Sequence, residues 1–309
     1  MIQKNLQFGI GIPQVFFDGK IDSQLISEFI TRAEALDYHS LWVAERVFGP
    51  IPSVDPILSL TYAAALTKKI KIGTSILLSV LRHPVHLAKG LASLDHLSQG
   101  RLIVGVGVGG YTQSPFYPAF GMSSEEVGDR FEEGIVLMEK LWAEEEVDFD
   151  GRFWQIKQMS VNPKPLQNPR PPLLFGAHVP RALRRAARMG DGWMASSVPA
   201  SLPFSEEIKL IKRYLEEEGR DPSTYSFSKR VYIAVDENKK RAEQKMKEWF
   251  GTLYKEPDLY SAAIFGNKQE CIDKLSEITS LGFNLLIADS VYDELEQVDI
   301  LAKDVLPYL

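Results

Sequence analysis

Cysteine is almost absent from this sequence of 309 residues, in which Cys271 is the only one. A single thiol cannot form an internal disulfide, which excludes a disulfide-rich secreted scaffold and favours a reducing compartment. No secretory signal precedes the first strand-like run, so we expect a cytoplasmic protein. The uncharged stretch over residues 102–124 is interrupted by glycine, proline and polar residues, which excludes a membrane-spanning helix.

An excess of positive charge is also missing. With 35 Lys and Arg against 41 Asp and Glu, the net charge is −6, which argues against nucleic acid or an anionic membrane as the main partner. Histidine is scarce, and His83 and His86 flank a proline without a carboxylate at ligand spacing, so we predict no metal site. The sequence has no G-x-S-x-G motif, and Cys271 lies inside a helical pattern, so no hydrolase nucleophile is visible.

Apolar residues make up 45% of the chain, in strand-like runs that alternate with amphipathic helical patterns. We predict strands at residues 6–10, 40–44, 70–77, 102–106, 172–175, 192–195, 228–235 and 284–288. We predict helices near residues 22–37, 54–68, 85–98, 123–145, 180–190, 205–219, 238–250 and 268–281, and a last one near 293–305. Eight strand–helix repeats predict an α/β fold, a TIM (β/α)8 barrel forming one domain over residues 1–309, rather than a doubly wound sheet.

One excursion interrupts this alternation between the fourth helix and the fifth strand. Residues 146–171 predict a hairpin that turns through Asp150-Gly151 and then a proline-rich connection, which we expect to cover part of the barrel. Local signals mark several helix starts. Ser123 and Glu126 form a capping-box pattern, and Pro84 and Pro180 lie at expected first-turn positions.

A glycine-rich stretch follows the fourth predicted strand, at residues 100–111. Gly105, Gly107 and Gly110 satisfy the G-x-G-x-x-G pattern of dinucleotide-binding folds, with Glu125 20 residues after the first of them. That pattern requires the last glycine to open a helix, and the following Tyr-Thr-Gln-Ser-Pro cannot start one. An NAD(P)-dependent reductase is therefore the less favoured interpretation. The alternative is a strand that presents bare backbone to a ligand.

A candidate anion site follows the fifth predicted strand. The strand ends near Gly176 and a helix begins near Pro180, so free backbone N–H groups gather over residues 179–182. Arg181 in the first turn opposes the helix dipole unless an anion is bound there, which favours a phosphate site. Three further arginines of this helix form either part of that site or a solvated basic face: Arg184, Arg185 and Arg188.

The second predicted strand ends in Trp42-Val-Ala-Glu45-Arg46. Barrel enzymes keep their reactive groups at the carboxyl ends of the strands, so Glu45 and Arg46 are candidate substrate-facing groups. A structural ion pair between them is the alternative that residue type alone leaves open.

Together these segments resemble the luciferase-like monooxygenase family, the flavin- and deazaflavin-dependent barrels that include bacterial luciferase. Five segments carry the resemblance: Ser-Leu-Trp-Val-Ala-Glu at 40–45, Ile-Gly-Thr-Ser-Ile at 72–76, His-Pro-Val-His-Leu-Ala at 83–88, the glycine-rich segment at 94–110 and Ala-Ala-Arg-Met-Gly-Asp-Gly-Trp at 186–193. The C-terminal segments at 266–271 and 305–309 agree with it, so the resemblance covers nearly the whole chain.

The resemblance implies a cofactor site at the barrel mouth. A non-proline cis peptide is expected at Ser75–Ile76, and the flavin ring is expected to lie against it. The residues that the resemblance assigns to the ring are Thr74, Ser75, Ile76, Gly107, Val108, Gly109 and Tyr111, and those that it assigns to the phosphate are Ala177, His178, Val179, Pro180 and Arg181. Trp42 and Trp193 are expected beside Tyr111 as pocket walls.

Two departures from the family bear on the reaction. Many members have a histidine where this chain has Arg46, and an arginine cannot shuttle a proton near neutral pH. Luciferase-type members have an arginine at the position of Val108. The resemblance implies a monooxygenase that uses reduced FMN and O₂ on a small organic substrate, with a flavin reductase as supplier and a homodimer as the assembly. The alternatives are hydride transfer with the deazaflavin coenzyme F420 and a non-catalytic flavin-binding protein.

Overall fold

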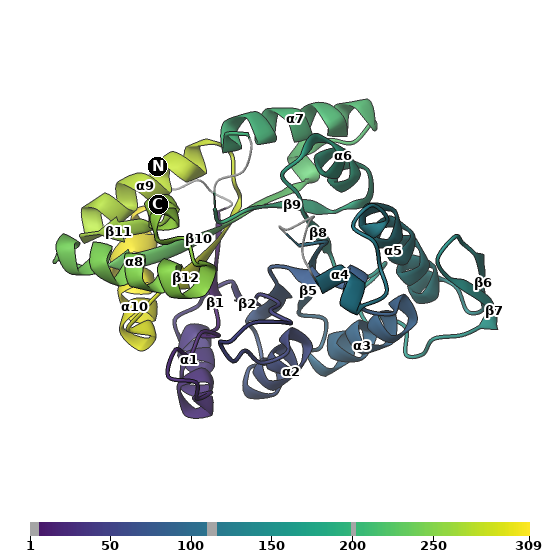
Figure 1. Ribbon diagram of the computed structural model, residues 1–309, viewed down its shortest axis with the longest axis horizontal. Coiled ribbons are helices and arrows are strands. Elements are labelled where there is room, and N and C mark those ends of the chain that lie inside the picture. The colour runs from purple at the N-terminus through teal and green to yellow at the C-terminus, as the bar shows by residue number, and fades with distance from the viewer. Residues whose placement is uncertain (1–5, 110–115, 199–201) are drawn as a thin grey trace.

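The computed structural model describes residues 6–109, 116–198 and 202–309, and within them ten strands form one sheet (Figure 1). Eight parallel strands of that sheet close into a ring, because β10 pairs with both β12 and β9. In order around the ring they are β1 (Gln7–Gly11), β2 (Ser40–Val43), β3 (Lys71–Thr74), β5 (Leu102–Gly107), β8 (Leu173–Gly176), β9 (Gly192–Ala195), β10 (Ser226–Val235) and β12 (Leu285–Ser290). The predicted TIM barrel is confirmed.

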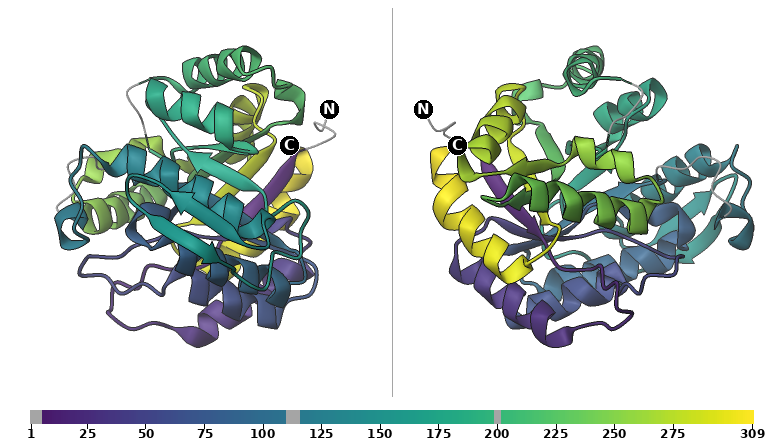
Figure 2. Two further views of the ribbon diagram at one scale, coloured as in Figure 1. Left: turned by 90° about the vertical axis from the view of Figure 1, so that its right-hand side faces the viewer. Right: turned by 60° about the vertical axis from the view of Figure 1, so that its left-hand side comes forward.

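Helices surround this ring. They are α1 (Ser23–Ala35), α2 (Pro56–Leu66), α3 (Pro84–Leu97), α4 (Phe116–Ala119), α5 (Val127–Ala143), α6 (Pro180–Met189), α7 (Phe204–Glu217), α8 (Lys239–Tyr254), α9 (Lys268–Ser280) and α10 (Glu294–Ile300). Figure 2 shows the last helix beside the first, where Tyr38 after α1 donates a hydrogen bond to the carbonyl of Val298 over 2.8 Å. In the described residues no helix is long and apolar enough to cross a bilayer.

Several predicted boundaries are confirmed and others are wrong. Pro84 and Pro180 occupy the first turns of α3 and α6 as expected. The predicted third strand is split after Thr74, and β4 (Leu77–Leu78) follows as a separate two-residue strand paired with β5. The capping box at Ser123 is absent, because α5 begins at Val127 and its N-cap, Glu126, makes no side-chain cap hydrogen bond. β11 (Ile264–Gly266), which pairs with the end of β10, was not predicted.

The barrel interior is filled by an apolar cluster centred on Trp42, which is 1% exposed. The other members come from four different strands: Ile103, Leu174, Met194, Leu285 and Ile287. The indole N–H donates to the hydroxyl of Ser40 over 2.7 Å, so its one polar atom is satisfied. Glycine at positions 9 and 73 leaves room for the ring, since a Cβ on Gly73 would lie 2.6 Å from the indole carbon Cζ3. The filled interior forces any ligand to bind above it, at the ends of the strands.

The predicted hairpin is confirmed as β6 (Val147–Asp150) and β7 (Gln155–Met159), but it does not cover the barrel. One carboxylate of α5, that of Glu133, accepts hydrogen bonds from the backbone N–H groups of Arg152, Phe153 and Trp154 over 2.8 to 3.0 Å. The hairpin is thereby attached to the outer side of α5, at the edge of the molecule (Figures 1 and 2).

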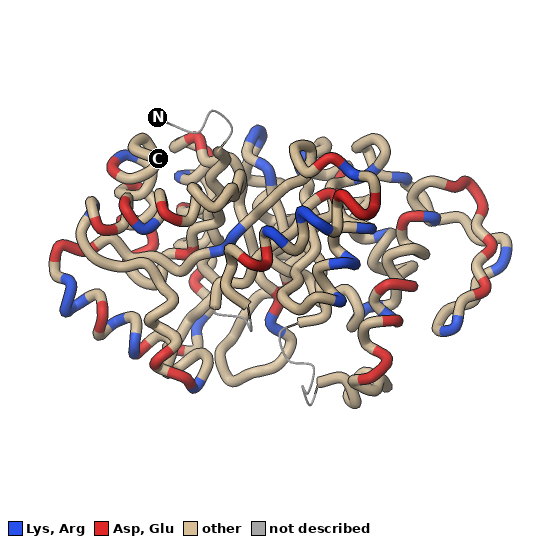
Figure 3. The backbone as a smooth tube through the Cα atoms, turned by 90° about the horizontal axis from the view of Figure 1, so that it is seen from above, with Lys and Arg blue, Asp and Glu red and all other residues tan. Residues whose placement is uncertain are grey.

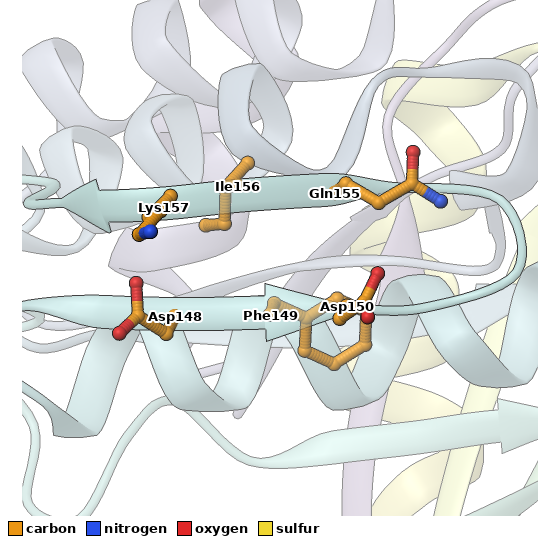
Figure 4. Close-up of a pocket in the computed structure, with 6 residues that line it drawn as sticks. All are labelled: Asp148, Phe149, Asp150, Gln155, Ile156 and Lys157. Carbon is orange, nitrogen blue, oxygen red and sulfur yellow. The ribbon is translucent and has the colours of Figure 1, made fainter.

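An open pocket of about 520 Å³ lies against the hairpin and is lined by residues of both its strands (Figure 4). It is lined by Asp148, Phe149, Asp150, Gln155, Ile156 and Lys157. It lies outside the ring of helices, and all six lining residues belong to the hairpin rather than to the ends of barrel strands. The pocket is therefore separate from the carboxyl ends of the barrel strands, where barrel enzymes bind their ligands.

Charged residues of both signs are interspersed along the outer helices (Figure 3). On α6, Arg184 pairs with Glu217 of α7, and Arg188 pairs with Glu132 of α5. Arg185 is 8% exposed and also pairs with Glu132. The arginines of α6 thus tie neighbouring helices together, and the interpretation of Arg185 as part of a solvated face is wrong.

Replacing Gly73 by alanine tests the packing of the barrel interior. The new Cβ would lie 2.6 Å from Trp42 Cζ3, so we expect Gly73→Ala to destabilise the protein. The expected loss is about 1–3 kcal/mol, the usual effect of overpacking a filled core. Gly90 of α3 has open space where a Cβ would stand, and Gly90→Ala is expected to stabilise by about 0.5–1 kcal/mol. Urea denaturation of both variants is the measurement, and equal effects of the two substitutions would contradict the packing argument.

Candidate functional site at the carboxyl ends of the barrel strands

The segment that follows β3 forms the centre of the barrel mouth. The peptide bond between Ser75 and Ile76 is cis, as the resemblance implied. The backbone of this segment is held by its neighbour, because Ser75 N–H donates to Val43 carbonyl over 2.7 Å and Glu45 N–H donates to Ile76 carbonyl over 3.2 Å. The ends of β2 and β3 are therefore fixed to each other.

The side chain of Ile76 lies over bare backbone of two neighbouring strands. A Cβ on Gly107 at the end of β5 would overlap the Cδ1 atom of Ile76, and a Cβ on Gly176 at the end of β8 would lie 3.0 Å from its Cγ2 atom. Beside it, the Ser75 hydroxyl is buried and has no hydrogen-bond partner in the described part of the chain. The mouth thus contains an apolar surface next to an unsatisfied polar atom, an arrangement that suits a planar ligand with polar edges.

The Glu45 side chain binds to the segment that follows β3. Its side chain is 2% exposed and pairs with the guanidinium of Arg82, which also pairs with Asp55 over 2.8 Å. Its second carboxylate oxygen accepts the backbone N–H of Leu78 over 2.5 Å. Burial raises the pKa of the Glu45 carboxyl, and the charge of Arg82 opposes that rise. The side chain therefore fastens the segment after β3 and does not pair with Arg46, which answers the question that residue type left open.

Arg46 lies in the mouth beside a group that sequence reasoning missed. Its guanidinium carbon lies 5.5 Å from the centroid of the Tyr254 ring, at the end of α8. The missed group is Arg230 on β10 and Asp289 on β12, which form an ion pair with side chains 17% and 12% exposed. Arg230 also donates to the carbonyl of Ser75 over 3.2 Å. The sequence signal that could have indicated this pair is a charged residue within each of two otherwise apolar strands.

Four other residues that the resemblance assigns to the ring are Thr74, Val108, Gly109 and Tyr111. Thr74 is fully buried and its hydroxyl donates to the Gly105 carbonyl over 2.7 Å, so its one O–H donor is not available to a ligand. Gly109 has a φ of +91°, which favours glycine, and the half-buried Val108 precedes it. Tyr111 lies outside the described residues.

The two tryptophans expected as pocket walls are core residues. Trp42 fills the barrel interior, as described above. Trp193 is fully buried outside the ring of strands, stacked on Phe283, and its indole N–H donates to Ala177 carbonyl over 2.7 Å. The prediction of these two side chains as pocket walls is wrong.

The predicted anion site lies at the start of α6, next to Ala177. Val179 is the N-cap and Pro180 occupies the first turn, and no side chain caps the helix. His178 is half-buried, and burial lowers the pKa of its imidazole, so the ring next to this helix start is neutral at pH 7. Arg181 is 75% exposed and pairs with Asp129 of α5 over 2.6 Å. The backbone N–H groups, rather than a free arginine, are what this helix end offers an anion.

Other chemistries have no visible basis in the described residues. No group of three or more His, Cys, Asp or Glu is placed to hold a metal ion there. Cys271 is fully buried, and burial raises the pKa of its thiol to about 12. A thiol with that pKa is protonated at neutral pH and is a poor nucleophile.

Comparison with known proteins gives consistent matches. A family model described as luciferase-like monooxygenase matches residues 17–268. An F420-dependent glucose-6-phosphate dehydrogenase of Kineococcus radiotolerans is 28% identical over 234 residues, which is 72% of this chain and 68% of the relative. The oxygenase component of a flavin-dependent trigonelline monooxygenase of Acinetobacter baylyi is 29% identical over 64% of this chain and 55% of the relative. The crystal structure of monooxygenase RslO1 from Streptomyces bottropensis superposes with a TM-score of 0.84 at 26% identity, covering 98% of this chain and 99% of that one.

Removing Arg82 tests the role of Glu45. In Arg82→Leu the buried carboxylate loses its cation, so the pKa of Glu45 in the folded state rises further above its unfolded value. The folded state then binds more protons than the unfolded state, and stability falls as pH rises through that folded pKa. We expect a loss of about 2–4 kcal/mol at pH 8 and a smaller loss at pH 5, measured by urea denaturation. Adding Glu45→Gln should remove the pH dependence of the loss; an equal loss at both pH values in the single variant would contradict this role.

Proposed function

Because the chain belongs to the luciferase-like monooxygenase family, whose members are oxidoreductases, we propose that it binds a flavin-type cofactor across the barrel mouth and uses it on a small organic substrate. The proposal rests on one observation above all, the apolar surface that Ile76 forms over the bare backbone of Gly107 and Gly176. A tricyclic ring needs a flat apolar support and a few polar atoms at its edge. The unpartnered hydroxyl of Ser75 is such an atom, so the residues present fit the group.

The start of α6 would receive the cofactor's phosphate. Backbone N–H groups at Arg181 and Ala182 and the neutral imidazole of His178 are donors that require no buried charge. The short strand β8 places this helix end beside Gly176, and thus next to the proposed ring surface. Phosphate and ring would then be held by two adjacent segments of the mouth.

Two cofactors are compatible with this geometry. Reduced FMN with O₂ would make the protein a monooxygenase, and a separate flavin reductase would then be its partner. The F420-dependent relative supports the deazaflavin coenzyme F420 at least equally well, with hydride transfer as the reaction. In either case the cofactor supplies the two-electron chemistry, and the chain binds it, orients the substrate and excludes water. We expect a homodimer in the cytoplasm.

The proton chemistry of the reaction falls to groups other than Arg46. A guanidinium stays charged at every physiological pH and can orient or bind a substrate without exchanging a proton with it. The Glu45 carboxylate is held by Arg82 and Leu78, so its role is to position the segment after β3. The absence of a proton-transfer group at position 46 keeps the non-catalytic flavin-binding protein as the alternative function.

Titration of the apo-protein with FMN, reduced FMN and F420 tests the proposed site. We expect one of the three to bind with a micromolar or lower Kd, and Ile76→Ala to weaken it about 5- to 30-fold through ~1–2 kcal/mol of lost apolar contact. Val136→Ala on α5 is the matched control, because Val136 is 38% exposed on an outer helix, and its affinity should equal that of the wild type. Failure of all three cofactors to bind would refute the proposal. Binding without oxidation of the reduced cofactor on any substrate would favour the non-catalytic alternative.

A further inference from the structure

The Arg230–Asp289 pair joins β10 to β12 and reaches the segment that follows β3. In the ring, β10 and β12 are consecutive strands and β12 is followed by β1, while β8 lies across the barrel from β1. The Arg230 guanidinium donates to Asp289 and to the carbonyl of Ser75, and the side chains are 17% and 12% exposed. Glycine at position 11 leaves the space that the Asp289 carboxylate occupies, because a Cβ there would overlap its Oδ1 atom.

Arg46 approaches the same half of the mouth from β2. Arg46 is half-buried, and its guanidinium carbon lies 5.5 Å from the Tyr254 ring centroid. The Tyr254 hydroxyl is 2.5 Å from that of Tyr232. The Arg230 guanidinium in turn lies 5.4 Å from the Tyr232 ring centroid, so two tyrosines connect the two arginines. Over residues 6–109, 116–198 and 202–309, no carboxylate lies within ion-pair distance of Arg46.

The charges in this cluster do not balance. Two guanidinium groups face one carboxylate, so the cluster carries at least one net positive charge whether or not Asp289 is ionised. Glu45, which precedes Arg46 after β2, cannot balance the charge because its carboxylate pairs with Arg82. The charge of Asp289 acts on both guanidinium groups, so one carboxylate is shared between two cations. A guanidinium that lies beside an aromatic ring keeps its edge N–H donors available to a planar oxyanion.

We propose that Arg46 and Arg230 form a subsite for a carboxylate group, and that the substrate is therefore a small organic acid anion. This inference rests on the proposed function, since it places the substrate beside the cofactor at the same mouth. The subsite lies across the barrel from the start of α6, so the cofactor's phosphate and the substrate's carboxylate would bind at opposite sides. Arg46 then binds the substrate's carboxylate, a role that requires no proton transfer.

Benzoate and its neutral analogue benzamide are suitable probes. Ligand-observed NMR titrations should show wild-type protein binding benzoate at least tenfold more tightly than benzamide, with a preference that weakens as NaCl is added. Arg46→Gln should reduce the preference to threefold or less. Arg152→Gln removes the same charge from the hairpin, where the side chain is 62% exposed, and should leave the preference unchanged. Arg230→Lys, which keeps the charge beside Asp289, should give an intermediate preference.

Titrating FMN and F420 into the wild type and the Arg46→Gln variant distinguishes a subsite for the substrate's carboxylate from one for an anionic group of the cofactor. A cofactor affinity that changes less than threefold, together with a lost benzoate preference, assigns the subsite to the substrate. A cofactor affinity that falls tenfold or more while the benzoate preference persists would overturn the inference and assign Arg46 to the cofactor. Equal binding of benzoate and benzamide by the wild type would also overturn it. The benzoate titration is made on apo-protein, so it gives a result even if no cofactor binds and the proposed function fails.

Discussion

The packing of the Trp42 indole inside the barrel determines where a ligand can bind. The indole fills the barrel interior and occupies space that Gly9 and Gly73 leave free. Since the interior is closed from below, only side chains at the strand ends and on the connecting segments can meet a ligand. The long side chains of Arg46 and Arg230 reach the mouth, and the side chain of Ile76 lies over Gly107 and Gly176 at the ends of β5 and β8. Core packing thus determines how deep the site is, and the side chains at the strand ends determine its chemistry.

The fold could be predicted from the sequence because its signals are local and repeated. Alternating strand and helix periodicities fixed the order of the eight barrel strands, and prolines located the starts of α3 and α6. β11 was missed because a three-residue strand carries too little periodicity to detect. The capping box at Ser123 failed because a pattern of residue types does not determine where the first helical turn closes.

The site could be predicted only in part, because it depends on which residues meet across the ring. The resemblance located the cis peptide at Ser75–Ile76 correctly. It could not show that Glu45 pairs with Arg82, 37 residues further along the chain, or that Arg230 reaches Ser75 across the mouth. Trp42 and Trp193 were misjudged for a related reason. An aromatic residue at the end of a strand pattern faces either the interior, the helices or the ligand, and only the register of the neighbouring strands decides which.

Asp55 both caps a helix and takes part in the ion-pair network of the mouth. One carboxylate oxygen caps α2 by accepting the N–H groups of Ile57 and Leu58, and the other pairs with Arg82, which in turn holds Glu45. The segments after β2 and β3 are therefore interlocked through a single acidic residue at the start of a helix. Anyone redesigning this half of the mouth for a new substrate cannot graft one segment alone. Residues 44–58 and 75–82 form one exchangeable unit, and a chimera that splits them would disturb a helix start and the ring-supporting segment together.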